Sequence, residues 1–289
     1  MYDPEESSPT FGVDLNSIQE RPSMAKVRVG DIDLYYEIHG AGYPLVLIRG
    51  LGSNADHWYA QVPAFSKKYR LVIFDNRGVG RSDKPDIPYT ISLMAADTVG
   101  LMDALSIPKA HILGLSMGGM IAQGIAIHYP ERVNGLILSC THCGGTRVVP
   151  PSSEVGRIFG ELVLTGSEEA NQKALNCLFT ERTLQDKPEL AQRYQEVSKK
   201  FPPSPKFLIH QWEAVRDHDS WEDLIKIQAP TLVITGRDDV LVPPMNSKVL
   251  AERIPNARLE VIEGGGHQFV VERADAFHQA VLKFLSSLS

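Results

Sequence analysis

The chain has 289 residues and a net charge of −6, with 43% hydrophobic and 22% charged residues. This composition excludes a collagen-like, coiled-coil or wholly disordered chain, and the length suffices for a large core without disulfide or metal staples. Residues 1–23 hold five acidic residues and one arginine, so the rest of the chain carries only −2. A nearly neutral body argues against nucleic acid or an anionic membrane as a partner.

The number of cysteines and the composition of the N-terminus indicate in which cellular compartment the protein is expected. Cys140, Cys143 and Cys177 are too few, and odd in number, for a disulfide scaffold. The acidic N-terminus has no apolar segment of the kind found in signal peptides. The sequence also contains no run of 18 or more apolar residues, the length that a membrane-spanning helix needs. We therefore expect a cytoplasmic protein in which residues 1–23 form a flexible acidic tail.

Short apolar segments rich in β-branched residues alternate with helical patterns along the rest of the chain. Such segments are typical of strands buried on both faces of a parallel sheet. The expected strands are 26–29, 32–38, 44–49, 70–75, 110–115, 135–140, 230–236 and 258–264. The expected helices lie near 55–66, 91–106 and 117–129, and at the C-terminus, where Phe277, Val281, Phe284, Leu285 and Leu288 form one apolar face.

The alternation of strands and helices predicts an α/β fold with a doubly wound, mostly parallel sheet. The first two strands form a hairpin around Gly30 and Asp31 in this interpretation. Residues 146–220 break the alternation because they are helical in composition and contain no clear strand. The predicted organisation is therefore a core domain made of 24–145 and 221–289, with a helical insertion at 146–220 over the sheet.

The strongest chemical signal is Gly114-Leu115-Ser116-Met117-Gly118-Gly119, between an apolar strand and a helical pattern. A serine on a tight strand-to-helix turn presents its hydroxyl at the carboxyl edge of the sheet. Such a turn strains the backbone of the serine, and glycines two residues before and after it remove the clashes of larger side chains. A chance G-x-S-x-G in a glycine-rich chain is the alternative, but its placement favours Ser116 as a nucleophile.

A serine nucleophile needs a base near neutral pH, normally a histidine held by a carboxylate. The chain has nine histidines, at positions 39, 57, 111, 128, 142, 210, 218, 267 and 278. His267 differs from the others because it follows Gly264-Gly265-Gly266 after a strand, which places it at the same sheet edge as Ser116. We therefore expect His267 to be the base.

The acid should follow a strand between the serine and the histidine. Asp238 and Asp239 both follow the 230–236 strand, and we choose Asp239, with Asp238 as a turn-forming alternative. The other position for an acid, after the 135–140 strand, holds Cys140-Thr141-His142 and no carboxylate. The backbone N–H groups of Met117 and Leu51 are the expected oxyanion donors, because one follows the nucleophile and the other lies on the loop after the 44–49 strand.

The chain order Ser116, Asp239, His267 is that of the α/β-hydrolase superfamily. The sequence resembles its small Ser-Asp-His esterase, enol-lactonase and haloperoxidase-like group over about residues 25–288. Besides the serine turn, the resemblance includes the run from Asp75 to Ser82, the segment Gly236-Arg237-Asp238-Asp239 and the pair Gly266-His267. It implies an α/β-hydrolase fold, a structural role for Arg77, and a helical cap at 146–220 that closes the pocket and sets substrate choice.

One position departs from the family pattern, because relatives usually have His-Gly where this chain has Arg49-Gly50. Arg49 either is a tolerated loop residue or reaches a substrate carboxylate or rearranges the oxyanion loop. Gly50, Cys140 and Trp212 are the other possible substrate contacts. The spacing of Cys140 and Cys143 also fits a redox or zinc pair, but pocket lining or core packing explains two such cysteines better.

These residues together predict a serine hydrolase that cleaves carboxylic esters through an acyl-enzyme intermediate, as carboxylesterases do. No cofactor or metal is expected. The nearly neutral body and the apolar side chains of 146–220 favour small to medium ester or lactone substrates that are uncharged or weakly charged. An enol-lactonase, a C–C bond hydrolase and cofactor-free perhydrolysis remain alternatives, as does a hydrolase-fold receptor for a small ligand. The oligomeric state is left open.

Overall fold

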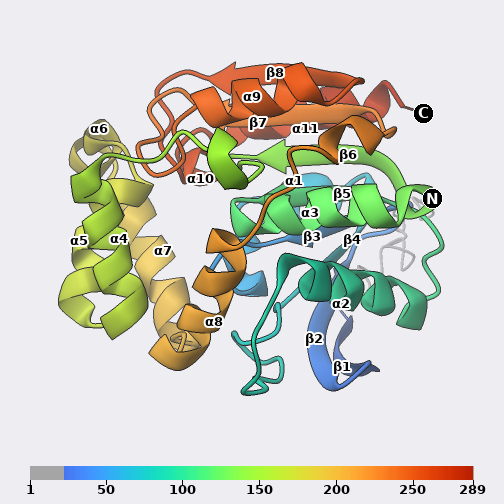
Figure 1. Ribbon diagram of the computed structural model, residues 1–289, viewed down its shortest axis with the longest axis horizontal. Coiled ribbons are helices and arrows are strands. Elements are labelled where there is room, and N and C mark those ends of the chain that lie inside the picture. The colour runs from blue at the N-terminus through green and yellow to red at the C-terminus, as the bar shows by residue number, and fades with distance from the viewer. Residues whose placement is uncertain (1–22, 289) are drawn as a thin grey trace, which may run out of the picture.

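The computed structural model describes residues 23–288 and has one eight-stranded sheet at its centre (Figure 1). The strands are β1 (Ser23–Val29), β2 (Ile32–His39), β3 (Tyr43–Ile48), β4 (Tyr69–Phe74), β5 (Ala110–Leu115), β6 (Val133–Ser139), β7 (Thr231–Gly236) and β8 (Ala257–Ile262). Their order across the sheet is β1-β2-β4-β3-β5-β6-β7-β8. The pairs β1–β2 and β2–β4 are antiparallel, and every other pair is parallel. The predicted mostly parallel, doubly wound sheet is confirmed.

The N-terminal hairpin is longer than the sequence indicated. Val29 pairs with Ile32, and Gly30 between them has a φ of +53°, as expected for a tight turn. β1 begins at Ser23, which pairs with Ile38, so the strand extends one residue into the segment predicted as tail. Its first residues have weak strand propensity, and the ladder with β2 determines their conformation. The remainder of the predicted tail, 1–22, lies outside the described residues.

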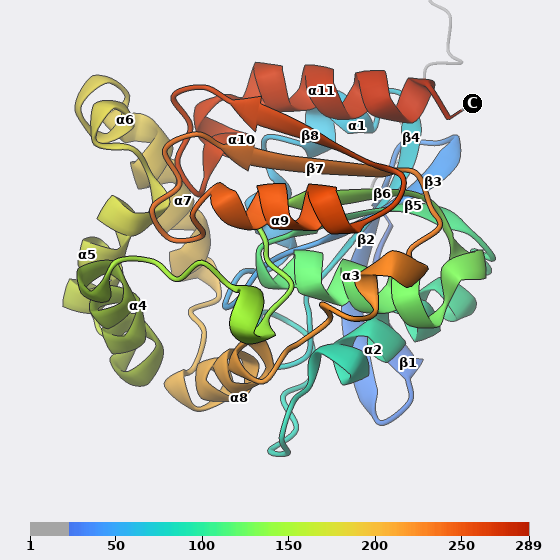
Figure 2. The same cartoon turned by 45° about the horizontal axis from the view of Figure 1, so that its top comes forward.

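Helices cover both faces of the sheet (Figure 2). One core cluster joins the sheet to α2 (Ile91–Ala104), α3 (Met117–His128) and α9 (Met245–Arg253). The opposite cluster joins it to α1 (Val62–Phe65) and α11 (Ala274–Ser286), whose predicted apolar face packs inward. The central strand β5 is buried throughout. Helices therefore cover both faces of the sheet, so a ligand-binding site can form only at the ends of the strands.

Two helical regions differ from the sequence interpretation. The helix expected near 55–66 is a 3-10 turn at Ala55–Trp58 followed by the short α1, because Pro63 begins a new helix and has no N–H to continue an earlier one. The sequence interpretation missed α9, whose apolar pattern is weak. The remaining short elements are α10 (Phe269–Glu272) and 3-10 turns at Pro130–Arg132, Gly145–Arg147 and Leu224–Lys226.

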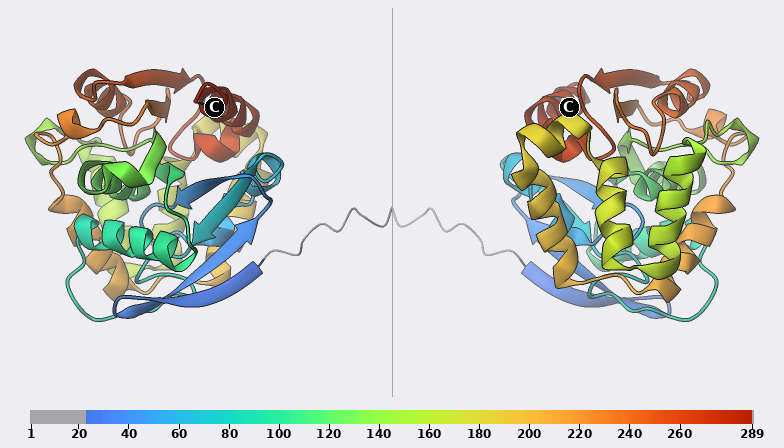
Figure 3. Two further views of the ribbon diagram at one scale, coloured as in Figure 1. Left: turned by 90° about the vertical axis from the view of Figure 1, so that its right-hand side faces the viewer. Right: turned by 90° about the vertical axis from the view of Figure 1, so that its left-hand side faces the viewer.

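The segment predicted as a helical insertion holds five helices and, as far as the structure describes it, no strand. They are α4 (Ser153–Thr165), α5 (Glu168–Leu178), α6 (Glu181–Asp186), α7 (Pro188–Lys200) and α8 (Pro205–Arg216). Ser152, Ser167 and Thr180 each cap one of these helices with a side-chain oxygen. The helices lie beyond the carboxyl ends of the strands (Figures 1 and 3). Of the helices in residues 23–288, none combines the length and apolar character needed to cross a membrane.

Candidate active site

Ser116 occupies a strained turn between β5 and α3. Its φ of +56° and ψ of −120° lie outside the regions that side-chain-bearing residues prefer. Two hydrogen bonds hold this conformation: the Ser116 N–H donates to the Ser139 carbonyl at 2.9 Å, and the Thr141 hydroxyl donates to the Ser116 carbonyl at 2.7 Å. The surrounding structure therefore fixes a backbone conformation that presents the serine side chain at the start of a helix.

The glycines beside this serine are required by close backbone contacts. A Cβ atom on Gly114 would lie 2.1 Å from the Gly118 carbonyl oxygen, and one on Gly118 would lie 2.1 Å from the Ile48 carbonyl oxygen. Real Cβ atoms essentially never approach backbone so closely. The steric role predicted for these glycines is confirmed, and α3 can pack directly against the end of β3.

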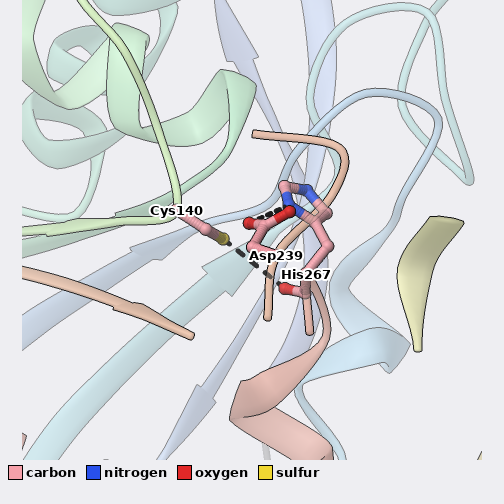
Figure 4. Close-up of side chains that lie close together, drawn as sticks. All are labelled: Cys140, Asp239 and His267. Carbon is pink, nitrogen blue, oxygen red and sulfur yellow. Dashed lines mark hydrogen bonds and ion pairs between the residues drawn. The ribbon is translucent and has the colours of Figure 1, made fainter. Parts of the chain in front are cut away.

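His267 and Asp239 form a buried pair at the same edge of the sheet (Figure 4). The His267 Nδ1 atom lies 2.8 Å from Asp239 Oδ2, and each residue is only 3% exposed. The other Asp239 oxygen accepts the N–H groups of Leu241 and Val242 at 2.9 and 2.8 Å, which fixes the carboxylate. Asp238 is exposed, so the structure pairs Asp239 and not its neighbour with the histidine.

The electrostatic environment distinguishes His267 from the other buried histidines. Burial lowers its pKa, but the Asp239 carboxylate outweighs burial and places the pKa well above 6.5. His57 also lines the cavity, yet burial, followed by the charge of Arg49, lowers its pKa to about 3. Burial similarly lowers the pKa of His142 to about 4. His267 is therefore the cavity histidine equipped to accept a proton and stabilise the resulting charge.

Ser116 and His267 line one cavity of about 350 Å³ between the sheet edge and the helices α4, α5, α7 and α8. Apolar side chains from the helical segment form much of its wall, namely Phe159, Leu162, Leu175, Leu178 and Leu208. Leu164, by contrast, is 68% exposed and lies outside the lining. The cavity thus combines the predicted nucleophile and the predicted base with a largely apolar space, as small-molecule sites do.

The loop after β3 packs directly against the serine. A Cβ atom on Gly50 would lie 3.0 Å from the Ser116 Cβ, and both Gly50 and Leu51 line the cavity. Met117 is buried at the first position of α3. Within residues 23–288, the backbone N–H groups of Leu51 and Met117 donate no hydrogen bond to another part of the chain. The two N–H groups predicted as oxyanion donors are therefore not used by the rest of the described chain.

The run from Asp75 to Ser82 supports this loop from behind. Asp75 is fully buried and accepts hydrogen bonds from the N–H groups of Ala55 and Arg81, both at 2.7 Å. The Asn76 amide donates to the Arg49 carbonyl at 3.1 Å. Arg77 is buried and pairs with Asp97 at 2.7 Å, so its side chain has a structural role.

Three of the predicted substrate contacts lie outside the lining of the cavity. Arg49 is fully buried, with its guanidinium carbon 4.7 Å from the centre of the Trp58 ring, so it points into the protein interior. Trp212 packs against Phe159, which itself forms the wall. Cys140 is fully buried beneath His267, and its sulfur lies 3.6 Å from the carbonyl oxygen of that residue (Figure 4). Arg49, Trp212 and Cys140 thus lie behind the lining, and their contact with a substrate stays a prediction, whereas Gly50 does reach the cavity.

One group of possible metal ligands occurs among the described residues. It comprises Cys140, Asp239 and His267, whose ligand atoms all lie within 4.8 Å of one another. Cys143 does not belong to it, so the C-x-x-C spacing does not converge on one position. All three cysteines are buried free thiols.

Sequence reasoning missed the residues that connect the histidine loop to the helical segment. Glu272 accepts hydrogen bonds from the Gly266 N–H at 2.7 Å and from the Thr180 N–H at 2.8 Å. The N–H of Gln268 donates to the Leu178 carbonyl at 2.8 Å, and Gln268 also lines the cavity. Only the position of Gln268 directly after His267 could have indicated a role, because the contacts that reach the helical segment, at Thr180 and Leu178, join residues about 90 positions apart.

A strained serine at a strand-to-helix turn, sharing a cavity with a buried Asp–His pair beside a mostly parallel sheet, defines the hydrolase class of α/β proteins. A family model for the alpha/beta hydrolase fold matches residues 43–274, and the chain belongs to this family. The predicted family and fold are thereby confirmed, and the protein is a hydrolase.

Known proteins of several activities resemble the chain over most of its length. The "Putative carbamate hydrolase RutD" of Azorhizobium caulinodans is 31% identical over 90% of this chain and 97% of its own. The crystal structure of an enol-lactonase from Burkholderia xenovorans is 30% identical with a TM-score of 0.81, over 91% of this chain and all of its own. A thermophilic esterase from Thermogutta terrifontis, solved with malate bound, is 27% identical with a TM-score of 0.81, over 92% of this chain and 99% of its own.

Proposed function

We propose that the protein hydrolyses carboxylic esters of small to medium size through an acyl-enzyme intermediate on Ser116. The observation that carries this proposal is the shared cavity of the strained Ser116 and of His267, whose Nδ1 is 2.8 Å from the buried Asp239 carboxylate. These are the groups that acyl transfer requires, namely a nucleophile, a base and a carboxylate that orients the base.

Each residue has a defined part in the proposed reaction. Ser116 attacks the ester carbonyl carbon while His267 takes its proton, and Asp239 holds the imidazole tautomer and stabilises the imidazolium. The N–H groups of Leu51 and Met117 bind the oxyanion. His267 then gives the proton to the leaving alcohol. A water molecule, with His267 again as base, hydrolyses the acyl-enzyme and releases the carboxylic acid.

The helical segment 146–220 acts as the cap in this proposal. Its side chains form the apolar part of the cavity wall, and hydrogen bonds at Leu178 and Thr180 connect it to the histidine loop. The cavity volume of about 350 Å³ is at the lower end of the range for small-molecule sites, which supports a small substrate.

Enol-lactone hydrolysis is the second candidate, and the likeness to the Burkholderia xenovorans enol-lactonase favours it. The same residues perform that reaction, because a lactone is an ester whose leaving oxygen stays attached to the acyl chain. The relative named for carbamate hydrolysis makes carbamates a third class of carbonyl substrate to test.

A substrate panel separates these activities and tests the proposal. Initial rates are measured with p-nitrophenyl esters of increasing acyl length, enol-lactones and aryl carbamates, for the wild type, Ser116→Ala and Ser198→Ala. Ser198 also lines the cavity but contacts His57 and not His267, so it is a matched control. Loss of the serine nucleophile should lower kcat by more than about 10⁴-fold. A Ser116→Ala rate within tenfold of the wild type, or stoichiometric binding without turnover, would contradict the proposal.

A further inference from the structure

Arg49 is a buried cation without a counter-charge. Its side chain is fully buried, and within residues 23–288 no carboxylate forms an ion pair with it. Its Nη2 atom donates to the neutral amide of Gln268 at a long distance of 3.3 Å, the Tyr194 side chain is a second polar neighbour, and its Nε and Nη1 atoms have no partner. A buried guanidinium is costly unless a negative group compensates it.

The groups around Arg49 also lack an acceptor. The indole N–H of Trp58 and the hydroxyl of Tyr59 are buried without hydrogen-bond partners in the described chain. Burial lowers the pKa of Arg49, and the groups that act most strongly on its charge after burial, Tyr194, Cys140 and Tyr59, include no carboxylate. The described residues around Arg49 therefore provide several donors and a positive charge, but no carboxylate.

The position of Arg49 relates this unpaired charge to the cavity. The cavity is lined by Gln268, which accepts the hydrogen bond of Arg49, and by Tyr194. The next residue after Arg49 is Gly50, which packs against Ser116. The charged side chains in the lining do not supply the anion, because Glu168 pairs with Lys199 at 3.3 Å. The Arg49 guanidinium thus lies behind the cavity wall, next to the wall residue Gln268.

We propose that Arg49 is the counter-charge for a carboxylate on the acyl part of the substrate, so that the protein prefers half-esters of dicarboxylic acids, or lactones with a carboxylate, over neutral esters. This inference rests on the proposed ester hydrolysis at Ser116. The substrate carboxylate takes the place of the Gln268 amide oxygen as acceptor from Arg49. A charged acceptor makes a stronger hydrogen bond than a neutral one, which gives the selectivity.

Selectivity is measured with pairs of p-nitrophenyl esters of equal chain length, one acyl group ending in a carboxylate and the other in a methyl group. The readout is the ratio of kcat/KM for the anionic to the neutral ester. We expect the wild type to favour the anionic ester, and Arg49→Met to lower the ratio about 10- to 100-fold, since hydrogen bonds to charged groups carry this much selectivity. Arg49→Lys should retain part of the preference. Arg216→Met, which removes an exposed cation that is already paired with Asp217 and lies outside the cavity lining, should change the ratio less than threefold.

Urea unfolding distinguishes this role from a structural one. Removal of an uncompensated charge in Arg49→Met should leave the ligand-free protein as stable as the wild type or more stable, whereas a structural arginine would be costly to replace. A wild type that favours the neutral ester, or a ratio that Arg49→Met leaves within threefold, would overturn the inference. So would a marked loss of stability in Arg49→Met.

Calorimetric binding of a linear dicarboxylate to Ser116→Ala separates failure of the inference from failure of the proposed function. This binding needs no catalysis and should weaken at least tenfold when Arg49→Met is added, and by a smaller factor when Arg49→Lys is added. If ester hydrolysis is absent but the dicarboxylate binds in this manner, the inference about Arg49 survives. If hydrolysis depends on Ser116 while Arg49 affects neither measurement, the proposed function stands and the inference fails.

Discussion

Replacement of Glu272 by alanine should weaken both the fold and the proposed reaction. Glu272 is only 4% exposed, and its two carboxylate oxygens accept hydrogen bonds from the Gly266 N–H, the Thr180 N–H and the Thr180 hydroxyl. Alanine leaves the two N–H groups without partners, while the hydroxyl keeps its bond to Thr183. At about 1–3 kcal/mol for each unsatisfied buried group, the free energy of unfolding should fall by about 2–6 kcal/mol.

The effect on activity follows from the neighbouring residue. Gly266 precedes His267, so a loosened loop displaces the proposed base, and a displacement of about 1 Å can lower kcat about 100-fold. Urea unfolding and kcat with a p-nitrophenyl ester are measured for Glu272→Ala and Glu272→Gln, the second of which retains one acceptor oxygen and should lose less. Glu263→Ala is the control, because Glu263 is exposed and pairs only with exposed Arg237. An unfolding free energy of Glu272→Ala within about 0.5 kcal/mol of the wild type would refute this reasoning.

Two further predictions concern the serine turn and the base. Gly118→Ala places a Cβ 2.1 Å from the Ile48 carbonyl and should abolish activity or soluble expression, whereas Gly156→Ala, with no atom within 4 Å of the new Cβ, should raise the unfolding free energy by up to about 1 kcal/mol; equal behaviour of the two variants would be contrary to this. Burial lowers the pKa of His267, but Asp239 raises it by more, so that it lies well above 6.5. The neutral form of His267 is the base, so kcat/KM should rise as the pH increases through this raised pKa. In Asp239→Asn the inflection should move to lower pH and the plateau should fall about 10⁴-fold, and an unmoved inflection would argue against the pairing.

The sequence predicts the parts of this molecule that local patterns determine. The central strands are short apolar runs, and their observed limits differ from the predicted ones by at most two residues at either end for the strands from β2 onward. Ser116 is recognisable because the contacts of Gly114 and Gly118 force glycine at fixed offsets from it. Asp239 and His267 are recognisable because both follow strands that end at one edge of the sheet.

The remainder depends on contacts that no local pattern records. Glu272 connects the histidine loop to the helical segment because it also meets Thr180, 92 positions away, and Arg49 meets Gln268 across 219 positions. Arg49 also shows the limit of placing a residue by its loop alone, because the loop reaches the cavity while the side chain turns toward Trp58. Helix α9 was missed because most of its length is polar, and packing against the sheet stabilises it.

Trapping of a covalent intermediate tests the proposed function most directly. The wild type and Ser116→Ala are incubated with a fluorophosphonate, and the modified residue is identified by peptide mass spectrometry. The proposed mechanism predicts one adduct on Ser116 of the wild type, formed together with loss of ester hydrolysis, and no adduct in Ser116→Ala. Modification of another residue with Ser116 unmodified, or full hydrolytic activity of the labelled protein, would contradict it.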